Sequence, residues 1–120
     1  GLYNNMALAY VDLKDFEKSR SLYLKAIRIM LGYENGAPEA AITYLNLADV
    51  VAAEYGLLDG AEEIDTYLNK AQELLDDYEI RDGNYAFVCE KCASVFGYYG
   101  RFLYEEELKE RAKRIYDKRS

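Results

Sequence analysis

Apolar residues recur at intervals of three and four along nearly the whole chain, which is the spacing that one buried face of an α-helix requires. The first stretch already shows this spacing, with Tyr3, Met6, Ala7, Tyr10 and Leu13 on one predicted stripe. No stretch alternates apolar and polar residues at period two for long enough to indicate a β-strand. The pattern predicts an all-α fold.

Capping and turn signals divide this pattern into about six helices. Asp15 stands where its carboxylate can accept hydrogen bonds from the unpaired first-turn amides of the second helix. Pro38 follows the turn dipeptide Asn35-Gly36 and suits the first turn of a helix, because it has no amide hydrogen to lose. A further turn at 82–84 opens the last pair of helices. The helices are therefore expected to form antiparallel pairs.

The predicted pairs align with one another on a shared alanine slot, which is filled by Ala7, Ala48 and Ala93 in the first helix of each pair and by Ala26, Ala71 and Ala112 in the second. Closely packed helices need a small side chain where their axes approach most nearly. The two slots are 19 residues apart in the first and third hairpins and 23 apart in the second, so extra residues are expected around Tyr55-Gly56, which ends the third helix. We therefore expect a single domain, 1–120, of tandem hairpins over about 1–34, 38–78 and 83–118.

This pattern resembles the tetratricopeptide repeat, whose signature alternates aromatic, large apolar and small residues along two helices. The first hairpin matches it best, with Tyr3, Met6, Ala7, Tyr10, Phe16, Ser19, Tyr23 and Ala26. The stretch 2–10, its echo at 44–48 and repeat periods of 41 and 45 residues are similar to the longer repeats of kinesin light chains and related bacterial proteins. Glu105 and Lys109 occupy slots for small and aromatic residues, which leaves open a rotation or register shift of the last helix.

The resemblance implies that one edge of the first helix of each hairpin faces a concave groove that binds a peptide. Asparagine is a mediocre helix former, yet it recurs beside the small-residue slot, where its amide could hold a peptide backbone. The alternative is that these polar residues are simply solvated or lie between helices. The groove candidates are Asn4, Asn5, Leu8, Asp12, Asn46, Asp49, Ala53, Lys91, Ser94 and Tyr98.

Some members of the resembled family grip a C-terminal carboxylate with a clamp of lysine, asparagine and arginine. In this chain only Asn46 and Lys91 occupy matching positions, while Asn4, Leu8 and Phe87 replace the other residues. A carboxylate clamp is therefore not expected.

The motif Cys89-Glu90-Lys91-Cys92 is the one whose spacing suits a redox pair or half of a zinc site. A structural zinc site needs four ligands, whereas the chain has two cysteines and no histidine. A redox pair of this spacing also needs an α/β setting that the sequence does not offer. Both cysteines fall on an apolar helical stripe, so we expect them to be buried packing residues and keep a Cys89/Cys92 redox or metal protein as the rival class. No enzyme activity, cofactor or metal is expected.

The formal net charge of −7 repels phosphate backbones and anionic lipid surfaces, so neither nucleic acid nor a membrane is an expected partner. The acidic clusters at 62–65 and 76–79 lack the glycine and alternating oxygen ligands of a calcium loop, which favours solvated helix faces. The chain contains neither a membrane-length apolar run nor a signal-peptide pattern. We expect a cytoplasmic protein.

The ends of the predicted array differ in polarity. The last helix is rich in charge and suits a polar cap, whereas the first helix opens at Leu2-Tyr3 with no polar helix before it. We therefore expect the C-terminal part of a longer repeat protein, able to self-associate through its open N-terminal edge. The expected function is a scaffold that binds a protein or peptide, and the alternative within that class is the peptide-sensing domain of a bacterial regulator.

Overall fold

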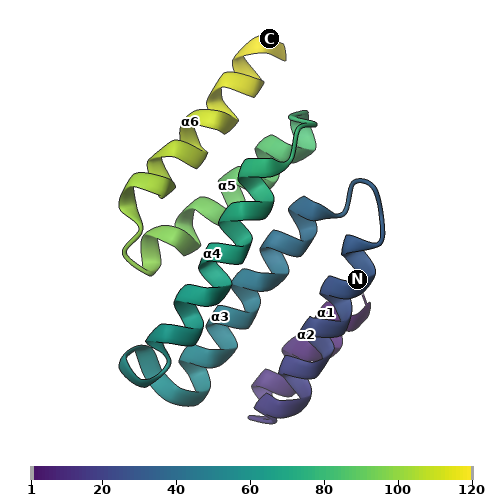
Figure 1. Ribbon diagram of the computed structural model, residues 1–120, viewed down its shortest axis with the longest axis vertical. Coiled ribbons are helices and arrows are strands. Elements are labelled where there is room, and N and C mark those ends of the chain that lie inside the picture. The colour runs from purple at the N-terminus through teal and green to yellow at the C-terminus, as the bar shows by residue number, and fades with distance from the viewer. Residues whose placement is uncertain (1, 120) are drawn as a thin grey trace.

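The computed structural model describes residues 2–119 and contains the expected helical hairpins (Figure 1). Within those residues the helices are α1 (Leu2–Asp12), α2 (Phe16–Leu31), α3 (Ala37–Asp59), α4 (Ala61–Asp77), α5 (Gly83–Tyr98) and α6 (Phe102–Arg119). The described residues include no strand, so the predicted all-α class is confirmed.

The helices begin where the sequence places caps. Asp15 precedes α2 and accepts a hydrogen bond from the Lys18 amide at 3.3 Å, as its position predicted. Asp82 caps α5 in the same manner, accepting from the Tyr85 amide at 3.0 Å. Pro38 lies in the first turn of α3. Local rules of capping and backbone geometry therefore account for these helix starts.

The extra residues of the second hairpin form a short helical turn instead of an open loop. Gly56 adopts a φ of 85°, a left-handed conformation that breaks the helix where Tyr55-Gly56 was expected to end it. The chain then resumes helical geometry, so α3 runs on to Asp59 and the predicted end is three residues too early. Gly60 follows and leads directly into α4.

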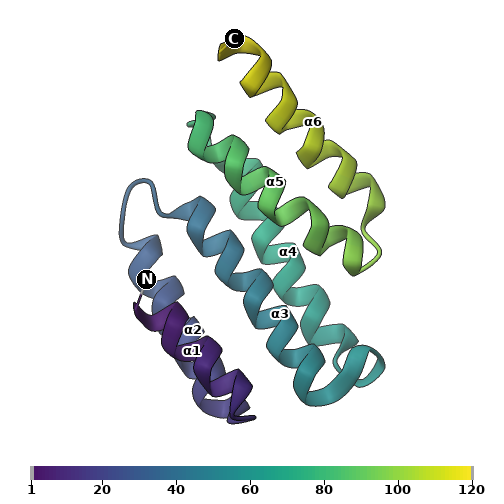
Figure 2. The ribbon, with the colours of Figure 1, turned by 180° about the vertical axis from the view of Figure 1, so that it is seen from behind.

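Within residues 2–119 the helices pack in three successive pairs, α1 with α2, α3 with α4 and α5 with α6. Each helix packs against its hairpin partner, and α3 also contacts α2 and α5, which joins the hairpins into one array. Figure 2 shows α1, α3 and α5 on the viewer's side, whereas α2 and α4 lie in front in Figure 1. The first helices of the hairpins thus share one face of the molecule.

The alanine slots lie at the helix contacts, as predicted. Ala7, Ala48 and Ala71 are fully buried, and Ala26, Ala93 and Ala112 are at most 4% exposed. One core cluster joins the second and third hairpins through Leu45, Leu68 and Phe96, and another joins the first hairpin to α3 through Tyr23 and Leu47. Burial of these apolar side chains is the main stabilising contribution to the array.

The apolar stripe of the first helix is only partly buried. Met6 is 39% exposed and Leu13 is 74% exposed, so their predicted burial is wrong. Met6 is exposed because α1 packs mainly on α2, which covers a narrower strip of α1 than the periodicity marked out. Leu13 is exposed because α1 ends at Asp12 and Leu13 lies in the turn that follows.

The last helix packs in register despite its two unusual residues. Leu108 and Ala112 are buried in the core cluster with α5, and the Tyr104 ring meets the Phe96 ring edge-on at 4.7 Å. Glu105 lies over Gly97, where an added Cβ would come within 2.5 Å of its carboxylate. Lys109 pairs with Glu105 at 3.5 Å. Gly97 therefore provides the space that the long side chain of Glu105 occupies.

Candidate peptide-binding face

The predicted groove residues lie on α1, α3 and α5, the three helices that share one face (Figure 2). Asn4 and Asn46 are half-buried. The others are exposed: Asn5, Leu8, Asp12, Asp49, Ala53, Lys91, Ser94 and Tyr98. The face therefore presents both polar groups and an aromatic ring to solvent.

The structure brings four of these candidates together between α3 and α5. Asp49, Ala53 and Tyr98 line a hollow of about 390 Å³, and Asp49, Ser94 and Tyr98 line an adjoining one of about 340 Å³. We call these two adjoining spaces the α3/α5 hollow. Asp49 and Tyr98 line both, so an acidic group and an exposed aromatic ring lie at its centre, with the Ser94 hydroxyl and the small Ala53 side chain beside them.

A short hydrogen bond links the two walls of the α3/α5 hollow. The Tyr99 hydroxyl donates to Asp49 Oδ1 at 2.5 Å, which joins the end of α5 to the middle of α3. Partial loss of solvent around the carboxylate raises the pKa of Asp49, and the hydrogen bond from Tyr99 opposes that rise by stabilising the charged form. Burial, followed by the bond to Asp49, raises the pKa of Tyr99, so the hydroxyl stays protonated and remains a donor.

The remaining candidates do not line this hollow: Asn4, Asn5, Leu8, Asp12, Asn46 and Lys91. In the described part of the chain, the side-chain oxygen of Asn4 is buried without a hydrogen-bond partner. An unpaired buried acceptor carries a desolvation cost, so α1 holds a polar group that a donor could still satisfy.

Sequence comparison agrees with the geometry. The family model described as tetratricopeptide repeat matches residues 1–66, more than half of the chain. The chain belongs to the tetratricopeptide repeat family. The match is consistent with the longer, kinesin-light-chain-like variety of repeat. No curated protein and no solved structure matches the chain.

Ion pairs fix the first hairpin of this tetratricopeptide repeat protein to the second. Arg20 on α2 donates to Glu54 on α3 at 2.5 Å and to Glu63 on α4 at 3.1 Å. The Arg20 side chain is only 25% exposed, so solvent screens these pairs less than it would screen fully exposed ones. The pairs link α2 to both helices of the second hairpin.

The two cysteines lie in the core. Cys89 and Cys92 are free thiols and at most 1% exposed. Burial raises the pKa of Cys89, and it raises the pKa of Cys92 to about 12. A thiol that stays protonated is a poor nucleophile and metal ligand, so the geometry favours packing over the redox or metal alternative. Among residues 2–119, no three metal-ligating side chains gather at one point.

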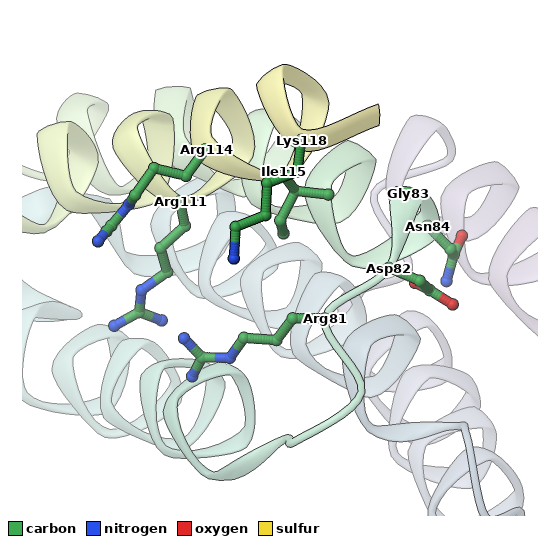
Figure 3. A pocket seen from close by; sticks show the side chains of 8 residues that line it. All are labelled: Arg81, Asp82, Gly83, Asn84, Arg111, Arg114, Ile115 and Lys118. Atoms are coloured by element: carbon green, nitrogen blue, oxygen red, sulfur yellow. The ribbon is translucent and has the colours of Figure 1, made fainter. Parts of the chain in front are cut away.

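The largest hollow that we describe was not found by sequence reasoning. Arg81, Arg111, Arg114, Ile115 and Lys118 line a cavity of about 730 Å³ beside the start of α5 (Figure 3). We call it the basic hollow. Arg111, Arg114 and Lys118 are three and four residues apart on one face of α6, a spacing that could have indicated a basic surface. Arg81, however, comes from the loop before α5. Only the folded chain shows that these residues share a cavity.

None of the helices within residues 2–119 is long and apolar enough to cross a membrane.

Proposed function

We propose that the face formed by α1, α3 and α5 binds a segment of a partner polypeptide and that the α3/α5 hollow is the centre of the binding site. The observation that supports this is the convergence of Asp49, Ala53, Ser94 and Tyr98 on one hollow in a member of a family whose repeats generally bind proteins. The role is binding, with no chemical step.

The residues of the hollow suit an extended peptide. Tyr98 is 71% exposed, and its ring offers a large contact area at little cost in conformational entropy. Asp49 accepts hydrogen bonds from backbone amides or from a cationic side chain. Ser94 can both donate and accept, and the small Ala53 lets the peptide backbone come close. We therefore propose a partner segment that carries an apolar or aromatic residue next to a donor group.

The test begins with a ligand selected for this chain. A displayed library of random peptides is panned on the protein, and the affinity of a selected peptide is measured by calorimetry for the parent chain and for A53R/S94R, which fills the hollow with two long cations. Two lost contacts at a central site predict binding weaker by about tenfold or more. The matched control is S21R/T66R, which adds the same charge at exposed positions of α2 and α4.

Equal affinity of the parent and A53R/S94R would exclude the α3/α5 hollow as the binding site. A second variant, N46A/K91A, measures how far the site extends along the face. A loss of affinity there assigns the neighbouring positions to the site, and no change confines the site to the hollow.

We also propose that the protein acts in the cytoplasm. Its two cysteines are unpaired thiols, which are usual where glutathione keeps proteins reduced. Cell fractionation with an antibody to the native protein tests the assignment, and recovery from a secreted or periplasmic fraction would overturn it.

A further inference from the structure

The basic hollow is an unusual surface for a chain whose net charge is −7. Arg81, Arg111, Arg114 and Lys118 line it, and Asp82 is the acidic residue of the lining. In Figure 3 the guanidinium groups of Arg81 and Arg111 face each other and the Lys118 side chain extends toward them, whereas Asp82 points away. Like charges that converge in this way repel one another unless an anion lies between them.

Two of these cations are already paired with carboxylates. Arg111 contacts Asp76 at 2.9 Å and Glu107 at 3.0 Å, and it donates to the Tyr85 hydroxyl at 3.1 Å. Arg114 lies 3.6 Å from Glu107. These contacts attach α6 to the end of α4 and set the position of one wall of the hollow.

The other two cations have no carboxylate within salt-bridge distance among residues 2–119. Arg81 is nevertheless held in place, since it donates to the carbonyls of Tyr78 at 3.3 Å and Asp76 at 3.1 Å. Its guanidinium also stacks 5.1 Å from the centre of the Tyr85 ring. The charge of Arg81 is therefore fixed in direction by neutral partners and remains available to a ligand.

We propose that the basic hollow is a second binding site, which takes an acidic segment of a partner polypeptide through two or more of its carboxylates. Arg81 and Lys118 supply the charges that pair with the carboxylates, and Arg114 adds a third at the rim. Ile115 offers an apolar surface to the methylene groups of glutamate side chains. The site shares no lining residue with the α3/α5 hollow, so it does not depend on the function proposed for that hollow.

The size of the cavity favours a peptide over a single small anion. Its volume of about 730 Å³ lies in the upper part of the range of roughly 300–1,000 Å³ that is typical of ligand pockets, and is far larger than one phosphate needs. Long polyanions such as nucleic acids meet the net negative field of the whole chain, whereas a short acidic peptide interacts mainly with the local cations.

The experiment uses a fluorescein-labelled hexaglutamate peptide, capped at both ends, and measures its anisotropy against the whole chain at low salt. The parent is expected to bind it and to ignore hexaglutamine of the same length. In R81Q/K118Q the affinity should fall by about tenfold or more, because two charge-assisted contacts are lost. Since Arg81 also supports the loop before α5, R114Q/K118Q provides a second test at exposed positions, with an expected loss of about fivefold.

The matched control is R28Q/K113Q, which removes the same charge from exposed positions outside the hollow and should change the affinity by less than about twofold. Equal weakening in the control and in R81Q/K118Q would mean that only the net charge matters, and would overturn the site. Absence of hexaglutamate binding, or binding of pyrophosphate without hexaglutamate, would also overturn the acidic-peptide assignment.

Discussion

In the first and third hairpins the two helices pack through the same alanine slot, but the large and small side chains beside it lie on opposite helices. In the first, Ser19 occupies the slot twelve residues after Ala7, and the larger Val11 stands one turn after that alanine. In the third, Glu105 occupies the corresponding slot after Ala93, and Gly97 stands where the first hairpin has valine. The larger side chain is on the first helix in the first hairpin and on the second helix in the third hairpin, while the alanine is the same in both. The contact thus depends on the summed size of facing side chains and not on each residue alone.

The largest effect is expected at the position that the two hairpins share. Ala7 and Ala93 are both at most 1% exposed, so A7L and A93L would each force a large side chain between the helices. Each variant should lose about 3 kcal/mol of unfolding free energy, as overpacked cores do. Urea denaturation followed by circular dichroism measures the loss. An unfolding free energy close to that of the parent, for either variant, would show that the helices of that hairpin do not need a small residue at this position.

A smaller effect is expected where the hairpins differ. G97V should cost only about 1 kcal/mol, because an added Cβ comes within 2.5 Å of the Glu105 carboxylate, which is the end of a flexible side chain and can move aside. The double variant G97V/E105S gives the third hairpin the residues of the first and should recover about half of that loss. Additive effects of the two substitutions in a thermodynamic cycle would contradict the proposed exchange of volume.

The first hairpin contains a hydrogen bond that the third cannot make in the same way. Ser19 Oγ donates to the Ala7 carbonyl at 2.9 Å, and both residues are fully buried. S19A should therefore cost about 1 kcal/mol, the net worth of one such bond. The exposed S21A provides the control and should change the unfolding free energy by less than about 0.5 kcal/mol. Equal unfolding free energies of S19A and the parent would show that this hydrogen bond does not stabilise the hairpin.

The smallest effect is a shift in one titration, at the link between the second and third hairpins. Because solvent loss raises the pKa of Asp49 while the Tyr99 hydroxyl lowers it, Y99F should raise that pKa further above its ordinary value of 3.8. A raised pKa means that the folded state binds the proton more tightly than the unfolded state. The contribution of Asp49 to stability is therefore greatest below pH 3.8 and is lost as the pH rises through the folded pKa. Carboxyl titration by NMR measures the pKa of Asp49 in the parent and in Y99F. A lower pKa in Y99F would contradict a stabilising hydrogen bond from Tyr99 to the carboxylate.

Much of the fold follows from local rules and was therefore predictable. Helical spacing marked the helices, Asp15 and Pro38 marked two of their starts, and the alanine slots marked where the helices meet. The exposure of Met6 and Leu13 was not predictable from the spacing, because it depends on how much of α1 its neighbours cover and on where α1 ends. The family resemblance also identified the candidate face, but which residues converge depends on how α5 lies against α3.

The basic hollow shows why spatial sites escape sequence reasoning. Arg81 and Lys118 belong to different elements, and the loop before α5 brings them to one cavity only when α6 packs back over the end of α4. Nothing in the spacing of these two residues along the chain indicates that they share a cavity.

Chemical-shift mapping shows whether the α3/α5 hollow binds a partner segment. A peptide selected by panning is titrated into ¹⁵N-labelled protein, and the amide shifts are followed along the chain. We expect the largest changes at the amides of Asp49, Ala53, Ser94 and Tyr98, which line the hollow. Changes confined to α2, α4 and α6, with those four amides unmoved, would contradict this expectation.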